Sequence, residues 1–290
     1  MVAEELANGV GLIVFVSYLQ QECAIESAAN YPNVQFIYFA HGLANNSIYQ
    51  DTSPNLFMLL PRAYSPLYFQ GMVCALVSRT QKLVIIVPTS GTMAAMHLNG
   101  FLAGARSINT GLEVSYGVVE DDTAEVATEK LAINMYNAGI DCVSHCTLTD
   151  GVQKALVLVN QTDLYSQGYM HNAHIWYGRS VVSSTKLQMN TVYNKIFEQF
   201  LANGSLTPNR GFLPTTYNVR PINPITALSD EVPPTNRKLV TNTYLNMRVN
   251  TTYDKVLCAL TPYYPDPPLD ENGCVTPEYI ISATSYSTEL

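Results

Sequence analysis

The sequence predicts an α/β protein in which parallel strands and helices alternate along the first two thirds of the chain. Short apolar runs rich in β-branched residues, such as Leu83–Val87, are typical of strands buried on both faces of a sheet. Stretches with apolar residues at helical spacing separate these runs, which is the pattern of a doubly wound sheet. We therefore expect parallel sheets flanked by helices.

The segment Lys82–Asn109 shows one strand-turn-helix step most clearly. The strand Leu83–Val87 is followed by a turn at Pro88–Gly91, where proline ends strand pairing and Ser or Thr can cap a helix. Small and apolar residues mark the next helix and would let it lie close against a sheet: Met93, Met96, Gly100, Phe101, Gly104 and Ala105. Ligands of such folds gather at the carboxyl ends of strands, so the turn is a candidate site, although helix capping alone also explains it.

The other elements follow from the same two patterns. Further strands are expected at Gly11–Val16, Val34–Phe39, Leu56–Leu60, Glu113–Val119, Asp141–His145, Tyr165–Met170 and Ser180–Ser184. Further helices are expected at Gln20–Asn30, Tyr64–Arg79, Glu120–Ala138, Gly151–Asn160 and Lys186–Leu201. Asp122 and Glu125 have the spacing of a capping box. Beyond Gly204 only Asn236–Met247 has helical periodicity, and we expect a tail that wraps the body; Trp176 is expected to pack.

Composition limits the function classes. The 290 residues are 47% hydrophobic, enough for a sizeable core in one large domain or two lobes. A net charge of -8 without a Lys/Arg cluster argues against nucleic-acid binding. Only 13% of residues are charged, and such a polar, weakly charged surface is commoner outside cells; four N-glycosylation sequons agree with that location. No apolar run is long enough to span a bilayer.

The six cysteines fall into two groups. Cys23, Cys74, Cys142 and Cys146 lie in expected elements and are interpreted as buried thiols, because the Cys142/Cys146 spacing has no second metal-binding pair. Cys258 and Cys274 bracket a Pro/Tyr/Asp-rich loop, where a disulfide is plausible and would indicate an oxidising compartment.

Catalytic motifs are lacking. There is no G-x-S-x-G elbow, Walker loop, dinucleotide fingerprint or H-E-x-x-H. His145 and Cys146 are neighbours on a strand, so their side chains point to opposite faces and cannot form an activated thiol pair. Asp121 and Asp122 at a helix start are better explained by capping and the helix dipole. We expect a non-enzymatic protein without a cofactor or metal.

An ordered series of segments resembles the basic membrane protein family, the PnrA-like solute-binding lipoproteins. It begins at Ala24–Phe36 and covers about residues 5 to 260. The other matching segments are Pro54-Asn55, Arg62–Tyr64, Tyr68–Gly71, Asn99–Phe101, Gly104–Asn109, Asp121-Asp122, Ala138–Asp141 and Leu228–Pro233.

The resemblance implies a type I periplasmic-binding-protein fold, two α/β lobes that close on a small ligand. Residues 1–80 and 181–260 would form lobe 1, residues 81–180 lobe 2, and residues 261–290 a C-terminal tail. The ligand in that family is often a purine nucleoside and the partner an ABC-type importer, which implies an extracytoplasmic location. Lobe 1 would be incomplete, because the family's first strand-helix-strand unit has no counterpart here and a sheet edge would be exposed.

The family's ligand-facing loops match positions that follow strand ends here. These residues are Ser17, Tyr18, His41, Thr89, Ser90, Asp122, His145, Thr147, Tyr169, His171 and Asn172. Aromatic and amide groups of this kind suit a neutral planar ligand. Where the family carries an acidic segment, this chain reads Gly168–Asn172, which removes carboxylates that would accept ribose hydrogen bonds.

Two functions follow, with one further possibility. The first is a non-catalytic binding protein for a nucleoside-like solute, served by a membrane transporter or receptor. The second is an extracellular interaction or signalling protein that kept the fold and lost the pocket, which the altered Gly168–Asn172 segment and the Pro/Tyr-rich tail favour. The third is a truncated sequence whose missing unit lies upstream.

Overall fold

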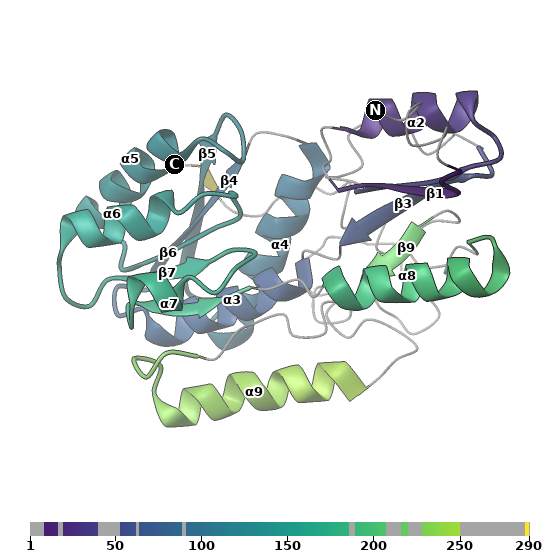
Figure 1. Ribbon diagram of the computed structural model, residues 1–290. Helices are drawn as coiled ribbons and strands as arrows, with labels where there is room; N and C mark the ends of the chain where they lie inside the picture. The colour runs from purple at the N-terminus through teal and green to yellow at the C-terminus, as the bar shows by residue number, and fades with distance from the viewer. Residues whose placement is uncertain are drawn as a thin grey trace. The chain divides into compact units, whose positions relative to one another are not determined.

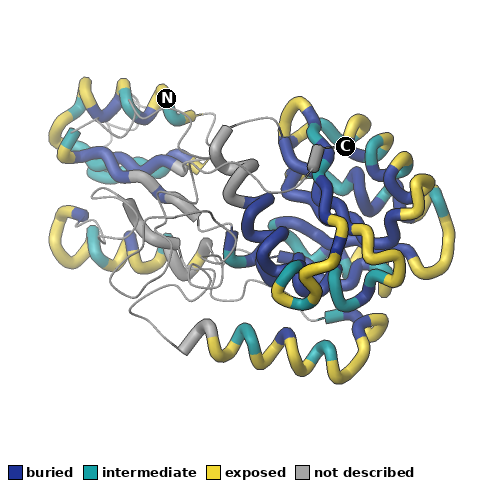
Figure 2. The backbone as a smooth tube through the Cα atoms, turned by 180° about the vertical axis from the view of Figure 1, so that it is seen from behind, coloured by how far each residue is buried: buried dark blue, intermediate teal, exposed yellow. Residues whose placement is uncertain are grey.

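A computed structural model describes residues 9–16, 20–39, 53–61, 64–88, 91–185, 189–206, 216–219, 228–249 and 288–289. The chain forms two compact units, Met1–Arg62 with Gln188–Arg220 and Ala63–Leu187 with Pro221–Leu290. Each unit has a parallel sheet with helices beside it, which confirms the predicted α/β class (Figure 1). Buried residues concentrate in the sheets and in the helix faces packed next to them. Exposed residues lie on the outer helix faces and in turns (Figure 2).

The first unit contains a four-stranded parallel sheet in the order β1-β2-β3-β9. Its elements are β1 (Leu12–Phe15), α2 (Gln21–Asn30), β2 (Gln35–Phe39), β3 (Leu56–Pro61), α8 (Met189–Asn203) and β9 (Thr216–Val219). Helix α2 buries one narrow face, made of Ala24, Ser27 and Ala28. The core of this unit joins Ile37, Phe57 and Leu59 of the sheet to Ile196 of α8 and to Leu206. Strand β9 was not expected, because its polar sequence lacks an apolar run.

Asn55 anchors the start of β3 to the chain around the end of α2. Its side-chain amide donates to three carbonyl oxygens, those of Ala28, Tyr31 and Val34, at 3.1, 3.1 and 2.8 Å. The Ala28 carbonyl lies in the last turn of α2 and the other two follow it, where helical partners run out. A buried asparagine therefore replaces the missing backbone donors.

The second unit contains a six-stranded parallel sheet in the order β10-β5-β4-β6-β7-β8. Its strands are β4 (Lys82–Pro88), β5 (Glu113–Val119), β6 (Cys142–His145), β7 (Tyr165–Gly168), β8 (Val181–Ser184) and β10 (Thr288–Glu289). Its helices are α3 (Tyr64–Val77), α4 (Gly91–Ile108), α5 (Glu125–Asn137), α6 (Gly151–Val159), α7 (His174–Tyr177) and α9 (Pro234–Val249). The short α7 and β10 were not expected from the sequence.

Strand β4 lies inside this sheet, paired with β5 on one side and β6 on the other. Its residues alternate between two covered faces, as expected for a strand buried on both sides. Val84 and Ile86 join a core cluster with Val143 of β6 and with apolar residues of α5 and α6. The Cys142 and Ser144 side chains on the opposite face contact α3.

Helices α3 and α4 pack together through glycines. A Cβ atom at Gly71 would lie 2.0 Å from the Phe101 carbonyl oxygen, and one at Gly104 would lie 1.8 Å from that of Tyr68. The small residues of α4 therefore lie at the contact with α3. From the sequence we expected them to face a sheet. This packing also changes the unit boundary, because α3 falls in the second unit and not in the first lobe as expected.

Residues after 220 also differ from the expected division. Helix α9 belongs to the second unit, where Tyr244 packs edge-to-face on Phe69 and the Asn236 amide donates to the Leu76 carbonyl at 3.4 Å. The predicted tail, residues 261–290, is described only at β10, which pairs with β5.

A disulfide joins Cys74 of α3 to Cys142 of β6. Two of the four cysteines predicted to be buried thiols are thus bonded, because the helix packs directly on the strand face that carries Cys142. Cys146 is a buried thiol as predicted, whereas Cys23 is exposed. The Cys258–Cys274 pairing lies outside the described residues.

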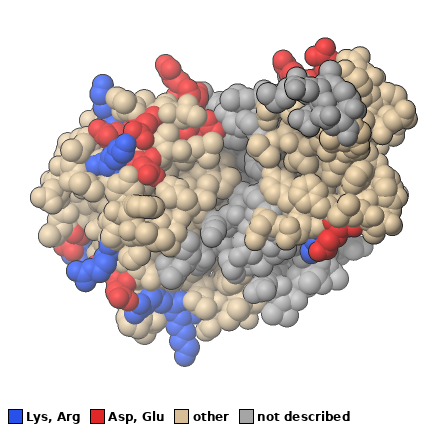
Figure 3. Space-filling view, in the orientation of Figure 1, with Lys and Arg blue, Asp and Glu red and all other residues tan. Residues whose placement is uncertain are grey.

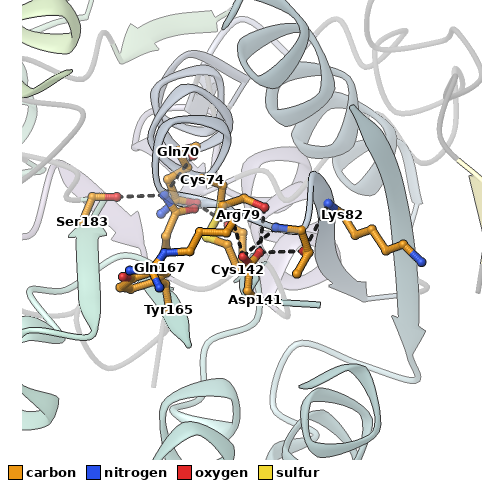
Figure 4. Close-up of a disulfide and its surroundings, with 12 residues drawn as sticks. Gln70, Cys74, Arg79, Lys82, Asp141, Cys142, Tyr165, Gln167 and Ser183 are labelled. Carbon is orange, nitrogen blue, oxygen red and sulfur yellow. Dashed lines mark hydrogen bonds between the residues drawn. A yellow bond between two sulfur atoms is a disulfide. The ribbon is translucent and has the colours of Figure 1, made fainter. Parts of the chain in front are cut away.

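Asp141, next to this disulfide, holds the turn between α3 and β4 (Figure 4). Its carboxylate accepts hydrogen bonds from the Ser78 hydroxyl and the Arg79 amide, both at 2.6 Å, and from the Thr80 amide and hydroxyl, both at 3.0 Å. The turn follows the last carbonyls of α3, where backbone groups need new partners. Disulfide and carboxylate together fix the end of α3 to the start of β6.

Candidate functional site

Six of the predicted ligand residues are described, and all six follow strand ends of the second unit. They are Asp122 after β5, His145 and Thr147 at the end of β6, and Tyr169, His171 and Asn172 after β7. The other five, Ser17, Tyr18, His41, Thr89 and Ser90, lie outside the described residues. The described part of the candidate site therefore lies at the carboxyl ends of β5, β6 and β7.

The loop after β5 turns sharply before α5 begins at Glu125. Asp121 Oδ1 accepts hydrogen bonds from the amide and hydroxyl of Thr123, both at 2.7 Å, and these bonds lower the pKa of Asp121. The N-cap of α5 is Ala124, which makes no side-chain cap. The predicted capping box of Asp122 and Glu125 is therefore wrong, because an Asp121 turn places the helix start at Glu125.

Asp122 is buried, with 1% of its surface exposed. Its backbone carbonyl accepts the Leu148 amide at 2.6 Å, which ties the loop after β5 to the loop after β6. The charge of Asp122 contributes, after burial, to raising the pKa of both Cys146 and Tyr169. The loops after β5, β6 and β7 therefore bring these three groups close together.

His145 is fully buried and hydrogen-bonded at both ring nitrogens. The Gln153 amide of α6 donates to Nε2 at 3.0 Å, so Nδ1 carries the proton and donates to the Thr147 hydroxyl at 2.9 Å. Burial, followed by the charge of His171, lowers the pKa of His145 to about 4. His145 is therefore a locally hydrogen-bonded histidine at a strand end, and it is neutral near pH 7.

Cys146 does not have the surroundings of a reactive thiol. It is 2% exposed, and burial raises its pKa, with a further contribution from Asp122. Its sulfur lies 3.7 Å from the Ile86 carbonyl oxygen of β4. A thiol that stays protonated is a poor nucleophile, so Cys146 serves to pack the strand end.

Tyr169 reaches from the end of β7 to α4. Its hydroxyl lies 2.9 Å from His97 Nε2, and the two rings meet edge-to-face at 5.5 Å between centroids. Tyr169 is 5% exposed, and burial raises its pKa. The Tyr169 ring therefore packs in the interior against His97. The sequence did not reveal this partner.

A network of buried amides and hydroxyls supports the ends of β6, β7 and β8. The Gln70 amide of α3 donates to the Gly168 carbonyl at 2.7 Å, and the Ser144 hydroxyl donates to Gln70 Oε1 at 2.9 Å. The Gln167 amide donates to the Gln70 carbonyl at 2.8 Å and to the Ser183 hydroxyl at 2.9 Å (Figure 4). The sequence signal that could have revealed this network is the presence of polar residues at buried strand positions.

His171 and Asp150 are partly exposed and contact each other. The His171 side chain is 40% exposed and that of Asp150 is 32% exposed, and Nε2 lies 3.0 Å from Asp150 Oδ1. The other carboxylate oxygen of Asp150 accepts the Tyr177 hydroxyl at 3.0 Å. Burial, followed by this bond, raises the pKa of Tyr177 to about 12.

Asn172 follows His171 and has an unused acceptor. Its side-chain oxygen is buried and, within the part of the chain that the structure describes, has no hydrogen-bond partner. A buried amide oxygen without a partner costs free energy, which a bound donor would recover.

Trp176 lies on the short helix α7 and is 76% exposed, beside Ile175, which is 69% exposed. The prediction that Trp176 packs is therefore wrong, because a one-turn helix on the surface has too little contact area to bury its outer face. These two side chains form an apolar spot close in sequence to the loop after β7.

Acidic and basic side chains occur in small mixed groups on the face shown in Figure 3. Among the described residues, no group of three His, Cys, Asp or Glu side chains could hold a metal ion. None of the helices in the described part of the chain is both long and apolar enough to cross a membrane.

The model of a family described as ABC transporter substrate-binding protein PnrA-like matches residues 1–211. The chain belongs to this family, which confirms the resemblance seen in the sequence. A CD4+ T-cell-stimulating antigen of Listeria monocytogenes is 26% identical over 78 residues, which are 27% of this chain and 22% of that protein. The match thus spans less than a quarter of this curated relative.

Solved structures with the same fold include solute-binding proteins. A transcriptional activator of the comK gene from Bacillus halodurans has a TM-score of 0.70 at 20% identity, over 87% of this chain and 83% of that chain. An ABC transporter solute-binding protein from Conexibacter woesei has a TM-score of 0.62 at 18% identity, over 84% and 78%. One from Aeropyrum pernix also has a TM-score of 0.62, at 15% identity, over 90% and 71%. These likenesses establish a type I periplasmic-binding-protein fold.

Proposed function

We propose that this chain is an extracytoplasmic solute-binding protein for a small polar ligand, a purine nucleoside, and that it delivers the ligand to an ABC-type membrane transporter. The observation that carries the proposal is membership of the PnrA-like substrate-binding family over residues 1–211. No catalytic step is needed for this role, which consists of capture and release.

The chemistry of the strand-end loops agrees with a neutral, planar, hydrogen-bonding ligand. Asn172 supplies a buried amide oxygen without a partner, and His171 supplies a partly exposed ring beside it. Such a pair suits a purine nucleoside. Its base offers N–H donors and a flat face, and its ribose offers O–H donors. His145 hydrogen-bonds to Thr147 and to Gln153 of α6, and this pair would act by holding the loops in place.

The remaining predicted positions belong to the same proposal. Ser17, Tyr18, His41, Thr89 and Ser90 lie outside the described residues and are proposed as ligand contacts from the family resemblance alone. Asp122 and Tyr169 are proposed to support the loops after β5 and β7 from within. Residue types of this kind, a few polar groups with aromatic rings, are usual in small-molecule sites.

The disulfide supports an extracytoplasmic location independently of the family. Cys74 and Cys142 are both fully buried and joined within one unit. Disulfides form and persist in oxidising compartments and are rare where thiols are kept reduced. We accordingly assign the chain to the secreted or cell-surface space.

An alternative is an extracellular interaction or signalling protein that retains the fold without a ligand pocket. The exposed Ile175 and Trp176 favour it, because large apolar side chains on a surface are common in protein contacts. Under this alternative the loop after β7 would bind a partner protein and no nucleoside.

Calorimetric titration of the full chain with inosine, guanosine and adenosine tests the proposal. We expect saturable binding with one site, and we expect Asn172→Ala to weaken it about tenfold, the loss of one hydrogen bond. Trp176→Ala is the matched control, because its side chain is exposed and outside the assigned contacts. A folded chain that binds none of the three nucleosides would reject nucleoside binding, and weakened partner binding by Trp176→Ala would then support the alternative.

A further inference from the structure

His171 lies between two groups that only accept hydrogen bonds. Its Nδ1 is 2.9 Å from the Tyr169 carbonyl oxygen, and its Nε2 is 3.0 Å from Asp150 Oδ1. A neutral imidazole carries one N–H and one acceptor nitrogen, so it can satisfy only one of these contacts. Both contacts are hydrogen bonds only when the ring is an imidazolium.

We infer that Asp150 positions His171 as an imidazolium and thereby makes the Tyr169–Asn172 loop sensitive to pH. In the protonated state the ring links the loop backbone to the start of α6. When the proton leaves, one ring nitrogen faces an acceptor oxygen with no hydrogen between them, and that contact must open. The effect on ligand capture rests on the proposed function; the effect on the loop does not.

The other titratable groups near the His171–Asp150 pair have partners of their own. His145 is already neutral, since burial lowers its pKa to about 4. On α5 and α6, Lys154 and Glu125 form their own ion pair at 2.6 Å, and Glu129 lies close enough to affect Lys154. Tyr177 donates to Asp150 as a neutral hydroxyl. His174 of α7 faces the Val181 carbonyl at 3.3 Å and does not contact Asp150.

The loop backbone is held in a form that needs outside support. Met170 has φ +66, a left-handed conformation that a side chain such as methionine rarely adopts. Its amide donates to the Thr185 hydroxyl at 3.1 Å, and the Ala173 amide donates to the Ser184 hydroxyl at 3.2 Å. These bonds hold the loop on its β8 side, whereas the His171–Asp150 contact joins it to the start of α6. Loss of that contact would free the loop on its α6 side.

Asp150 is suited to a substitution test. It occupies the N-cap of α6 but makes no side-chain cap, so Asp150→Asn removes charge without removing a cap. An asparagine amide can donate to a neutral Nε2 while Nδ1–H still donates to the Tyr169 carbonyl. The variant should therefore keep the loop closed whether or not His171 is protonated.

Nitrogen-15 NMR of the full chain between pH 5 and 8 tests the inference. In the wild type we expect both His171 nitrogens to be protonated at the acid end, and the amide signals of residues 169–173 to move with the loss of the proton. We expect Asp150→Asn to remove that amide response, and His171→Gln to identify the ring signals. His174→Gln is the matched control and should leave the response intact.

Amide signals of residues 169–173 that stay fixed while the His171 ring titrates would overturn the inference. Inosine titrations across the same pH range separate it from the proposed function. We expect the wild-type Kd to change about fivefold and the Asp150→Asn value to stay constant. A coupled loop that binds no inosine at any pH would support the loop inference and reject nucleoside binding.

Discussion

Strand β4 and the strands β6, β7 and β8 are buried in the same sheet but differ in residue type. Strand β4 is aliphatic, whereas the other three also carry buried polar side chains. Lys82–Pro88 carries five consecutive aliphatic residues, and its core contacts are apolar. The other three strands carry Ser144, Gln167 and Ser183 at positions with no exposed surface. Apolar burial stabilises β4, whereas the other three strands combine apolar burial with hydrogen bonds between buried polar side chains.

This difference explains where a ligand site can form. Apolar packing is non-directional and gives a stable centre, whereas an amide network fixes the position of each strand end. The network lies at the ends of β6 and β7, next in sequence to His145 and Tyr169. A site with placed polar groups needs that kind of support, and β4 supplies the stable base beside it.

Removing the disulfide between α3 and β6 should lower the free energy of unfolding more than any other change proposed here. The Cys74–Cys142 bond closes a loop with a sequence separation of 68, and loop closure of that length contributes about 4 kcal/mol. Cys74→Ala with Cys142→Ala should lower the free energy of unfolding by this order, measured by urea denaturation. Cys23→Ala, at an exposed free cysteine, should change it little. Equal losses in both variants would contradict the account.

Truncating a buried side chain of β4 should have the second largest effect on the free energy of unfolding. Ile86→Ala leaves a cavity in the cluster with Val143 and should lower the free energy of unfolding by about 3 kcal/mol. The control is Val126→Ala on α5, where the side chain is 64% exposed and the expected loss is small. If the control costs as much as Ile86→Ala, burial does not decide stability here.

Acid should destabilise the chain through His145. Its folded-state pKa, lowered from 6.5 to about 4, means that the unfolded state binds the proton first as pH falls. Stability from this group is therefore present above pH 6.5 and lost towards pH 4, by about 3 kcal/mol at 1.36 kcal/mol per pKa unit. His145→Gln should flatten the stability profile between these pH values, while His174→Gln should keep its slope. Parallel profiles for wild type and His145→Gln would refute this assignment.

Cutting one amide from the network should have the smallest of these effects. Gln167→Leu removes the hydrogen bonds to the Gln70 carbonyl and to the Ser183 hydroxyl and should cost about 2 kcal/mol in chemical denaturation. Gln161→Leu is the control at an exposed loop position. A neutral or stabilising Gln167→Leu would show that the network does not support the strand ends.

The same contrast explains what the sequence could predict. The run Leu83–Val87 identified β4, and the order of apolar runs predicted the α/β class, because period and length suffice for apolar strands. Strand β9, with the sequence Thr216–Val219, gives no such signal and was missed.

The site was predicted less completely than the fold. The resemblance pointed to His145, Tyr169 and His171 at strand ends, but their partners Gln153, His97 and Asp150 depend on how distant segments pack. The Cys74–Cys142 bond has the same cause, since nothing in the spacing of 68 residues reveals that α3 lies on β6.

Amide hydrogen exchange with and without saturating inosine tests the central claim most directly, that the loops at the polar strand ends bind the solute. We expect slower exchange at residues 145–148 and 169–173 when inosine is bound, and unchanged exchange in β4. Unchanged exchange in both loops at saturating inosine would contradict the account.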